Sequence, residues 1–565
     1  MVNRGRVDRT EWRWVVMWIA VALVVTSIPL AIGLIRSSPD RVFGGATFAV
    51  EDVNSYFAKM RAGASGEWLF RIVYTSEPHD GALFFLFHIL LGKLAALIGW
   101  PLEVMYHLAR SLFGALALIV LYRFITLFSG SVALRRIAFL LVVFGGGSGW
   151  VLMLTAQPNW LGSPPLDLIL PEGFTFLVLY AMPHIALART FLMLGLLFIW
   201  ESGADSEAPR QWGGRLAGVW AGVCWTAMAF IVPFYVLVVY AIGLGAFAAS
   251  AAARSIDWAQ TRRTILACAI AGIVPTYAFV VFTTNSVFAI WSSQNQVISP
   301  HPLHYVVAYG VVGGLALASL PWAWRRRERI WRFLVGWMLI IPPLLYLPFG
   351  LQRRLIEAWQ APVSILAAVT LARVALPAVR RSRLVRWLTR FPRYTSGGLQ
   401  RWALSGLLLL TTPTFGLLLL DQSARAAAGW PPMFRDGGEV AALDWLSART
   451  TYDDVVLCAY DTGNYLPARA AVRVFVGHGP ETVHLDEKLP LVKRFYLVEA
   501  DDGWREAFLR DWGIDVVFVG PFERELGTAD LSGRAYLKLE YDVGGYQIYR
   551  VIGEQRESAN QRAGE

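Results

Sequence analysis

The segment "WVVMWIAVALVVTSIPLAIGLIR", residues 14 to 36, decides what kind of fold this chain adopts. A helix needs about 20 apolar residues to cross the hydrocarbon core of a bilayer, and this run is long enough to do so. Arginines precede it, as they would a signal peptide, but the run is long and lacks a small-residue cleavage site. The segment therefore predicts a retained signal anchor.

The composition extends this prediction to the whole chain. Its 565 residues are 56% hydrophobic and only 16% charged, with a mean hydropathy of +0.47, which is far from the balance of a soluble domain. The net charge is +10, but the arginines lie in short clusters between apolar runs. They therefore indicate membrane topology, and we exclude nucleic acid as a partner. Cys224, Cys268 and Cys458 imply no disulfide framework.

Hydropathy predicts an α-helical polytopic membrane protein with about eleven transmembrane helices. Positive residues collect on the cytoplasmic side. With the N-terminus inside, clusters such as "RRRER" at 325 to 329 fall in inner loops, and the outer loops 155–182 and 284–303 contain no Lys or Arg. We therefore expect a multi-pass protein of the plasma (inner) membrane with a cytoplasmic N-terminus. The predicted spans are 14–36, 108–128, 137–154, 183–200, 215–231, 233–250, 264–283, 304–322, 333–347, 360–378 and 402–420.

The apolar segment 82–99 tests this topology. Counting it as a span would move Arg135 and Arg136 outside and invert every later loop. The segment also carries His88 and Lys93. We therefore expect an interfacial or re-entrant helix on the outer face.

The polar sequence falls on the outer side of this map. It forms a first outer loop, residues 37–107, and everything after residue 420. Helical periodicity in "EVAALDWLSA", the short β-branched runs "DDVVLCAY", "VRVFVG" and "IDVVFVG", and the hairpin pattern "YDVGGYQIYRV" predict a small C-terminal α/β extracytoplasmic domain. The predicted organisation is a membrane domain at 1–420, an α/β domain at 421–555 and a disordered tail at 556–565.

The first outer loop begins with two adjacent acids in "VEDVNSYFAKM", residues 50 to 60. Tyr56, Phe57 and Met60 share one side, which favours an amphipathic helix on the membrane surface, ended by the glycines of "RAGASGEWL". Asp52 would lie at or near the N-cap of this helix, held by backbone N–H groups. Capping alone explains an Asp there as well as a functional role does.

The order of features in this loop resembles the C-type (GT-C) membrane glycosyltransferases. An Asp is followed four residues later by an aromatic, then by "GEWL", and then by the acidic step "SEPHDGALFF". The chain looks most similar to bacterial members related to the protein O-mannosyltransferases and the lipid A aminoarabinose transferases. The motif resemblance covers residues 48–86, with weaker support at 346–366.

The resemblance implies roles for individual residues. Its Asp-aromatic spacing selects Asp52 as the base and Tyr56 as a substrate-binding residue. Val53 stands where relatives have a second acid, and Glu51 precedes the Asp instead. Glu51 is therefore kept as a supporting catalytic or metal-binding candidate. His79 and Asp80 lie in the region where relatives have a substrate-binding His-Pro-Pro or Lys-Pro-Pro sequence, but the residue types here differ from both.

The implied reaction moves a sugar from a polyprenyl-phosphate donor to an acceptor hydroxyl with inversion, and a mannose-like sugar is one candidate. A positioned Asp52 can take the acceptor's proton as the new bond forms. A glycosidase also needs an acidic carboxyl for its leaving group, whereas phosphate leaves as a stabilised anion. The acceptor class stays open among glycan, lipid and protein.

A phosphate needs cations on the outer face, where arginines are scarce. Arg353 and Arg354 stand in the outer connection "YLPFGLQRRLIEAWQAP", beside Glu357. We expect them to bind the donor phosphate through charge-assisted hydrogen bonds, and the alternative is an interfacial anchor or an Arg-Glu pair. Arg189 and His184, near the outer end of a span, are weaker candidates for donor and substrate binding, because a structural salt bridge explains Arg189 equally well.

Three further patterns are left open. The acids and His79 suit Mg or Mn, but the sequence does not fix a metal. "GGGSGW" at 145–150 indicates close helix packing. The loop 461–484, rich in Gly, Asn and His, could select the acceptor or cover the active site, although strand-end loops often look like this.

Two other function classes remain as alternatives. A transporter or flippase of lipid-linked sugars would show mid-membrane ionisable residues and paired repeats. No clear repeat is present, and the acids gather in the outer loop. A receptor or assembly protein would not need about eleven spans. The sequence therefore favours the enzyme.

Overall fold

The structure is a computed structural model that describes residues 7–201, 216–391 and 393–552. The chain divides into two compact units, each built from separate stretches of sequence. Unit 1 comprises residues 1–28, 107–278 and 297–422, and unit 2 comprises 29–106, 279–296 and 423–565. The tail predicted to be disordered, 556–565, lies outside the described residues.

Long apolar helices make up most of unit 1. Among the described residues, eight helices are long and apolar enough to cross a membrane, and a bent pair raises the number to nine. This confirms a helical polytopic membrane protein. The eight are α1 (Arg9–Arg36), α4 (Leu102–Ile125), α5–α6 (Val132–Phe144 and Gly149–Leu154), α9 (Pro183–Glu201), α11 (Tyr235–Ala252), α12–α13 (Trp258–Ala271 and Ile273–Thr284), α15 (Leu303–Trp324) and α17–η4–α18 (Gln360–Thr370, Leu371–Ala375 and Leu376–Arg381).

The remaining predicted spans form shorter or bent helices. The run 402–420 falls on α20 (Ser396–Leu410) and α21 (Pro413–Ala428), which meet at 50°. The runs 215–231 and 333–347 form α10 (Ala217–Ile231) and α16 (Arg329–Leu344), of 15 and 16 residues. These two fall below the length that a perpendicular crossing needs, about 20 residues. By length, the described residues thus hold eight or nine spans.

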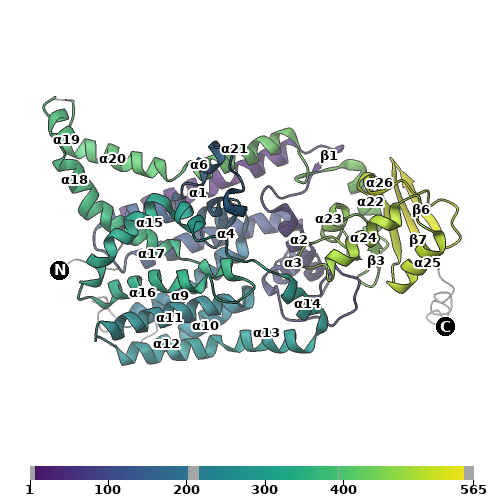
Figure 1. Cartoon of the computed structure of the whole chain (residues 1–565), viewed down its shortest axis with the longest axis horizontal. Coiled ribbons are helices and arrows are strands. Elements are labelled where there is room, and N and C mark those ends of the chain that lie inside the picture. The colour runs from purple at the N-terminus through teal and green to yellow at the C-terminus, as the bar shows by residue number, and fades with distance from the viewer. Residues whose placement is uncertain (1–6, 202–215, 392, 553–565) are drawn as a thin grey trace. The chain divides into compact units, whose positions relative to one another are not determined.

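The helices of unit 1 pack as neighbours around buried small residues. Helix α10 lies against α9 and α12, α11 against α16, and α17 against α15 and α5 (Figure 1). A Cβ added to Gly245 of α11 would lie 2.6 Å from the carbonyl oxygen of Gly336 in α16, and one added to Gly336 would lie 2.2 Å from that of Gly245. Only glycines allow two helices to approach so closely. Shorter elements complete the unit: η1 (Trp160–Gly162), α7 (Leu166–Ile169), α8 (Thr175–Ala181), η3 (Gln352–Ile356) and α19 (Arg383–Leu388).

Unit 2 joins residues 29–106 to the C-terminal part of the chain. Strand β1 (Arg41–Phe43) pairs antiparallel with β2 (Phe434–Asp436). The apolar segment 82–99 forms α3 (Leu86–Ile98), whose 13 residues are too few to span a bilayer. The other elements before the main sheet are α2 (Val50–Ala64), α14 (Ser286–Gln294) and α22 (Gly437–Ser447).

A five-stranded mixed sheet forms the core of the C-terminal region (Figure 1). Its order is β4-β3-β5-β7-β6, with β3 parallel to β4 and β5, and β7 antiparallel to β5 and β6. The predicted helix, strands and hairpin are all confirmed. The bounds are β3 (Val455–Leu457), α23 (Tyr460–Arg469), β4 (Arg473–Val474), α24 (Leu485–Tyr496), α25 (Asp502–Asp511), β5 (Val516–Val519), α26 (Pro521–Leu526), β6 (Leu537–Val543) and β7 (Tyr546–Val551).

Candidate active site

Helix α2 carries both acids in its first turn. It begins at Val50 after Ala49, whose φ of 46° is left-handed, and it ends at Ala64, between the two glycines of the segment predicted to end it. Ala49 occupies the N-cap position without a side-chain hydrogen bond, so Asp52 lies near the cap but does not supply it. A carboxylate in the first turn is still favoured by the positive end of the helix dipole.

Helix α2 has its polar side buried, which differs from the amphipathic surface helix we expected. Asn54 and Lys59 are 1% and 2% exposed. The Asn54 side chain donates to Asn464 of α23 at 2.8 Å, and Lys59 pairs with Glu481 at 2.7 Å. Asn54 and Lys59 therefore face the C-terminal part of unit 2 and not water. The sequence pattern could not reveal this, because the partners lie about 400 residues away.

Two glycines set the distance between α2 and α3. A Cβ on Gly63 would lie 2.0 Å from the carbonyl oxygen of Ile89, and one on Gly92 would lie 1.7 Å from that of Met60. This close approach leads to a stack of Tyr56 on His88, with ring centroids 4.5 Å apart and an interplanar angle of 10°. Tyr56 therefore packs against α3, and its predicted contact with substrate stays a prediction.

Glu51 ties α2 to the loop that follows β4. Its Oε1 accepts a hydrogen bond from the Tyr460 hydroxyl and another from the Gly479 N–H at 3.0 Å. Burial, together with the bond to Glu51, raises the pKa of Tyr460, so this phenol remains a donor. The geometry favours the supporting role of Glu51 over a role as a second base.

Asp52 is partly exposed to solvent. Its side chain is 47% exposed, and its Oδ1 lies 3.7 Å from Nε2 of His478, whose side chain is only 5% exposed. That separation is too long for a hydrogen bond and short enough for strong electrostatic coupling. Within the described part of the chain, neither ring nitrogen of His478 has a hydrogen-bond partner. A histidine held beside an open carboxylate is an arrangement suited to proton transfer.

The contacts of His478 continue inward to a buried ion pair. Its Nδ1 lies 4.0 Å from Oε1 of Glu481, the carboxylate that pairs with Lys59. Burial lowers the pKa of Lys59, and Glu481 opposes that shift. The Lys59 ammonium also lies 4.4 Å from the centre of the Phe85 ring. We call Asp52, His478, Glu481 and Lys59 the acid–histidine cluster.

A close backbone contact positions His478. A Cβ on Gly477 would lie 2.4 Å from the carbonyl carbon of Gly463 in α23, and one on Gly463 would lie 2.0 Å from the carbonyl oxygen of Val476. The loop thus lies directly on α23, the helix that also contacts α2. Of the two interpretations of loop 461–484, the position of His478 favours a part in the active site.

His79 and Asp80 are engaged differently. His79 accepts the Ile72 N–H at Nε2 and contacts the Glu77 carbonyl through Nδ1, both at 2.9 Å, and burial lowers its pKa. Asp80 is exposed, and its backbone carbonyl accepts a long bond from Asn285 at 3.5 Å. His79 therefore fixes its own loop, and a role of either residue in substrate binding stays a prediction.

In unit 1, the candidates for binding the donor phosphate form two groups. In the closed group the side chain is buried and bonded to other protein groups, and in the open group it is less buried and makes fewer such bonds. Arg189, 3% exposed, binds Glu357 through two hydrogen bonds of 2.5 and 3.0 Å, and it also donates to Thr175 Oγ1 and to the carbonyls of Pro171 and Glu172. Arg189 therefore forms the structural salt bridge that we considered as the alternative to donor binding. His184 is buried near the start of the same helix.

Arg353 and Arg354 are the open group. They lie in η3, and Glu357 is paired with Arg189 rather than with them. Arg354 faces Glu172 at 3.7 Å, while Nε of Arg353 is buried and has no hydrogen-bond partner among the described residues. Burial lowers the pKa of Arg353. A half-buried guanidinium with an unused donor is suited to bind an oxyanion.

The "GGGSGW" segment holds a buried acid that the sequence did not indicate. The N–H groups of Gly147 and Gly149 each donate to Oδ2 of Asp167 at 3.1 Å, and the Thr414 hydroxyl donates at 2.8 Å. Burial raises the pKa of Asp167 to about 6, and these bonds oppose the shift. The glycines therefore interrupt the helix between α5 and α6 to surround a carboxylate, in addition to packing.

The predicted metal ligands do not gather into one site. Among the described residues, no three His, Cys, Asp or Glu side chains come together in a way that could hold a metal ion. Oε1 of Glu51 and both ring nitrogens of His79 are engaged by neighbouring groups. These side chains as arranged do not fit Mg or Mn, so we derive no step through a metal.

Comparison with known proteins identifies the architecture. No family model matches the sequence, and no curated protein does. Archaeal oligosaccharyltransferase AglB from Archaeoglobus fulgidus, in complex with an inhibitory peptide and a dolichol-phosphate, is 13% identical, with a TM-score of 0.52 over 97% of this chain and 75% of AglB. Arabinofuranosyltransferase AftD from Mycobacteria is 17% identical, with a TM-score of 0.53 over 97% of this chain and 42% of AftD.

ArnT from Cupriavidus metallidurans, bound to undecaprenyl phosphate, is 15% identical, with a TM-score of 0.49 over 96% of this chain and 98% of ArnT. The narrower assignment to relatives of the protein O-mannosyltransferases or the lipid A aminoarabinose transferases stays a prediction. At the level of the fold, the likeness to AglB and AftD confirms the resemblance inferred from the sequence: this chain has the architecture of the GT-C membrane glycosyltransferases.

Proposed function

We propose that this protein is a membrane glycosyltransferase that moves a sugar from a polyprenyl-phosphate donor to an acceptor hydroxyl on the extracytoplasmic face. The observation that carries the proposal is the half-exposed Asp52 carboxylate beside the buried His478. The fold supports it, since AglB has been solved with a dolichol-phosphate and ArnT with undecaprenyl phosphate. The sugar, including the mannose-like candidate, and the acceptor class are not assigned.

Asp52 acts as the base in this proposal. The acceptor oxygen forms its bond to the anomeric carbon while its proton passes to Asp52, and the bond from that carbon to the phosphate oxygen breaks. Attack opposite the leaving group inverts the anomeric centre. The phosphate leaves as a stabilised anion, so the reaction needs no second, protonated carboxyl of the glycosidase type.

His478 serves as a positioning residue in the same proposal. An imidazole N–H group whose nitrogen lies 3.7 Å from Asp52 would favour the ionised carboxylate that a base requires. The Lys59–Glu481 pair and the contact of Gly477 with Gly463 hold the imidazole in place. Glu51 fixes the loop from the other side through Tyr460 and Gly479.

Arg353 and Arg354 bind the donor phosphate in this proposal. The unused Nε of Arg353 is the strongest support. Arg189 contributes indirectly, because its bonds to Glu357 and to the carbonyls of Pro171 and Glu172 fix the segments on either side of the two open arginines. We make no such proposal for His184.

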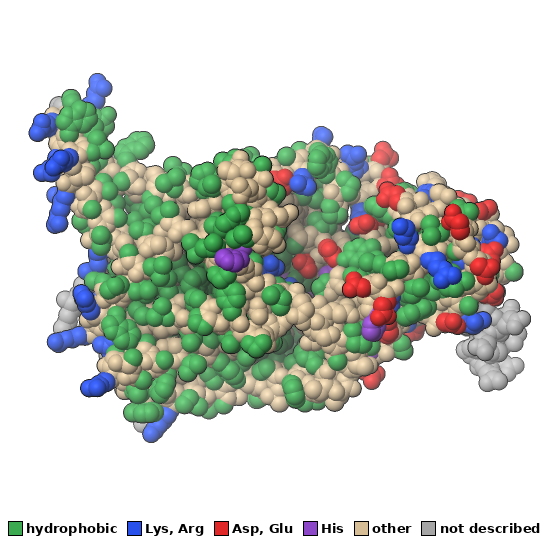
Figure 2. Space-filling view, in the orientation of Figure 1, with side chains coloured by type: hydrophobic (Ala, Val, Ile, Leu, Met, Phe, Trp, Pro, Cys, Tyr) green, Lys and Arg blue, Asp and Glu red, His purple; other side chains and the backbone are tan. Residues whose placement is uncertain are grey.

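The proposed topology keeps eleven crossings. Eight long helices, the bent pair α20–α21 and the shorter helices α10 and α16 coincide with the eleven predicted segments. With the N-terminus cytoplasmic, the arginine-rich segments around α18 and α19 lie inside, and Figure 2 shows Lys and Arg gathered over this end of unit 1. The loop 37–107 and the region 421–555 then lie outside.

The decisive experiment replaces the base. Purified protein in liposomes is given labelled undecaprenyl-phosphate sugars and a crude envelope extract as acceptor. We expect Asp52→Asn to abolish transfer while the protein expresses and folds as the wild type does, because the amide keeps the shape and loses the basicity. Asp486→Asn, which changes an exposed acid in the first turn of α24, is the matched control.

The same preparation separates the enzyme from a transporter or flippase. Movement of a fluorescent lipid-linked sugar across the liposome membrane is measured without acceptor. Full translocation in both wild type and Asp52→Asn, with no transfer product from either, would favour the flippase. Equal transfer product from wild type and Asp52→Asn would remove Asp52 from the role of base.

A further inference from the structure

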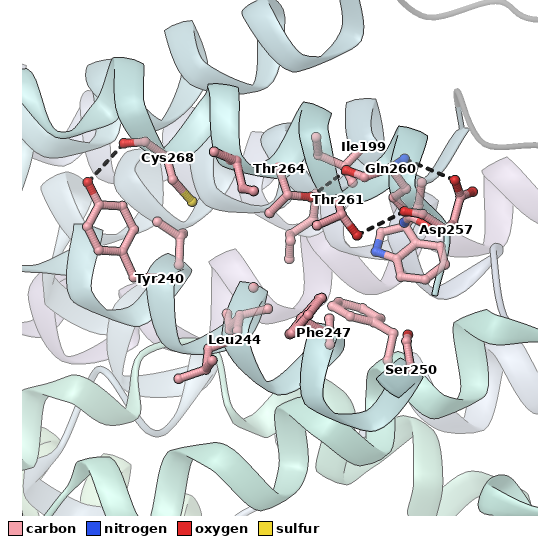
Figure 3. A pocket seen from close by; sticks show the side chains of 18 of the residues that line it. Ile199, Tyr240, Leu244, Phe247, Ser250, Asp257, Gln260, Thr261, Thr264 and Cys268 are labelled. Carbon is pink, nitrogen blue, oxygen red and sulfur yellow. Dashed lines mark hydrogen bonds between the residues drawn. The ribbon is translucent and has the colours of Figure 1, made fainter. Parts of the chain in front are cut away.

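A cavity of about 610 Å³ lies between α9, α11, α12 and α16 of unit 1, and none of the candidate site residues lines it (Figure 3). Its volume falls within the range of about 300–1,000 Å³ that is usual for small-molecule sites. Apolar and aromatic side chains line most of it, including Leu244, Phe247 and Ile265. Leu244 and Ile265 are 59% and 62% exposed, so the cavity opens to the surroundings of the helices.

The surroundings at this opening are the membrane. Helices α9, α11 and α12 are among those long and apolar enough to cross a bilayer. A cavity that opens sideways between such helices faces hydrocarbon, and a hydrocarbon chain fills it at lower free-energy cost than water does. The shape and chemistry therefore suit the acyl chain of a lipid.

Polar groups gather at one end of the cavity. Ser250, Asp257, Gln260 and Thr261 lie there (Figure 3). Arg329 of α16 also lines the cavity and contacts Asp257. Asp257 accepts from the N–H groups of Ala259 and Gln260 at the start of α12 and pairs with Arg329 at 2.6 Å. The negative charge of Asp257 is therefore already compensated.

Among the described residues, the charge that remains at this end is positive. The loops and turns next to α11, α12 and α16 carry more arginines than acids, and Arg326 and Arg329 pair with the acids Glu328 and Asp257. Trp258, 60% exposed, stands at the same level, where aromatic side chains commonly meet the membrane interface. An anionic head group is therefore favoured over a zwitterionic one. The arginines are Arg254, Arg262, Arg263, Arg325, Arg326, Arg327, Arg329 and Arg332.

The donor's prenyl chain is the competing occupant. Its phosphate is proposed to bind Arg353 and Arg354, which follow the C-terminal end of α16. Arg329 begins that helix, so the polar end of the cavity lies at the opposite end of α16 from the phosphate candidates. A lipid with its head at Arg329 therefore belongs to the other leaflet, which is the cytoplasmic one in the proposed topology.

We propose that this cavity is a binding site for an anionic glycerophospholipid of the cytoplasmic leaflet. One acyl chain lies among Leu244, Phe247 and Ile265, and the phosphate lies at Trp258 and Arg329. The bound lipid joins α12 to α11 and α9 and stabilises this part of unit 1. The proposal does not depend on the assignment of Asp52, because the site has its own residues.

Native mass spectrometry of the full chain tests the proposal. Delipidated protein is titrated with phosphatidylglycerol and with phosphatidylcholine of identical acyl chains. We expect one phosphatidylglycerol to bind about tenfold more tightly than phosphatidylcholine and to raise the unfolding midpoint. Leu244→Trp, which fills the cavity, should remove both effects, and Arg329→Gln should remove the preference for phosphatidylglycerol.

Matched variants and a competing lipid complete the test. Leu237→Trp on α11 and Arg386→Gln on α19 lie outside the cavity lining and should bind as the wild type does. If Leu244→Trp fails to fold, Ala246→Leu fills the same cavity. Equal binding of the two phospholipids, or unchanged binding by the cavity-filling variants, would overturn the proposal. Displacement of phosphatidylglycerol by undecaprenyl phosphate would assign the cavity to the donor's chain instead.

Discussion

The two units each hold a carboxylate beside a cationic or potentially cationic group, and they do so in opposite ways. Asp52 in unit 2 is 47% exposed and lies 3.7 Å from His478. Glu357 in unit 1 is fully buried and takes two hydrogen bonds from Arg189, which also donates to Thr175 and to the Glu172 carbonyl. The first arrangement leaves a carboxylate partly exposed to solvent, and the second buries both charged groups. Burial of a charged pair therefore points to architecture, and an open acid on a buried support points to chemistry.

Breaking the Arg189–Glu357 ion pair should have the largest effect on stability. Arg189→Met leaves the Glu357 carboxylate buried without its partner, and removal of one member of a buried pair typically costs about 3–5 kcal/mol. We expect a large fall in the unfolding midpoint of the detergent-purified protein, measured by tryptophan fluorescence.

A double variant distinguishes a broken pair from lost packing. Arg189→Met with Glu357→Leu removes both charges, so it should recover most of the stability. If Arg189→Met alone unfolds like the wild type, the pair contributes little, and Arg189 becomes available again as a phosphate ligand.

Asp167 shows a third way to hold a buried acid, with neutral donors and no cation. Its pKa is raised to about 6 by burial, so the folded state keeps the proton where the unfolded state, with a pKa near 3.8, loses it. Stability should therefore fall as the pH rises from about 4 to 6 and stay lower above that, by about 3 kcal/mol at 1.4 kcal/mol per pKa unit.

This dependence is measured as the unfolding midpoint between pH 4 and 7. In Asp167→Asn, which does not titrate, the decline attributable to this group should disappear. Identical pH profiles for the two proteins would show that the carboxylate is already ionised in the folded state at pH 4.

The membrane architecture could largely be predicted from the sequence, because it depends on local composition. Long apolar runs such as 14–36 became helices, and the predicted hairpin "YDVGGYQIYRV" formed β6 and β7 with glycines 544 and 545 at positive φ. The number of transmembrane spans was harder to predict from the sequence, because α10 and α16 are apolar but short.

The site could be predicted only where its signal is local. The spacing from Asp52 to Tyr56 selected α2, but nothing near Asp52 indicates His478 or Glu481, which come from a loop more than 400 residues later. Lys59 lies in the middle of an amphipathic helix, where the local pattern predicts a solvent-exposed side chain. Its partner Glu481 is too distant in sequence for the pattern to indicate the pair. Likewise, Glu357 is close in sequence to Arg353 yet pairs with Arg189, because η3 turns it inward.

Loss of His478 should have an intermediate effect on activity. If it positions Asp52 and favours its ionised form, His478→Gln should lower kcat/KM about 10- to 100-fold, which is below the full contribution of about 10²–10⁴ from a general base. The acidic side of the pH–rate profile should also move, which a purely structural role would not produce.

The matched control for this prediction is His484→Gln. His484 lies in the same segment but is 44% exposed and faces Glu487 at 3.8 Å. It should behave as the wild type does. A proportional loss at every pH in His478→Gln, with no change in the profile, would indicate packing rather than positioning of the base.

The smallest effect should come from the open arginines, because each contributes only part of the binding of one phosphate. Arg353→Gln should raise the KM for the undecaprenyl-phosphate sugar about tenfold with little change in kcat, the pattern of lost binding shared by ground and transition states. Arg354→Gln should do less, since Arg354 already faces Glu172 at 3.7 Å. Arg383→Gln, an arginine of α19, is the control. Unchanged donor affinity in the Arg353/Arg354 double variant would support the anchor alternative, because an interfacial anchor stabilises the membrane boundary without contacting the donor.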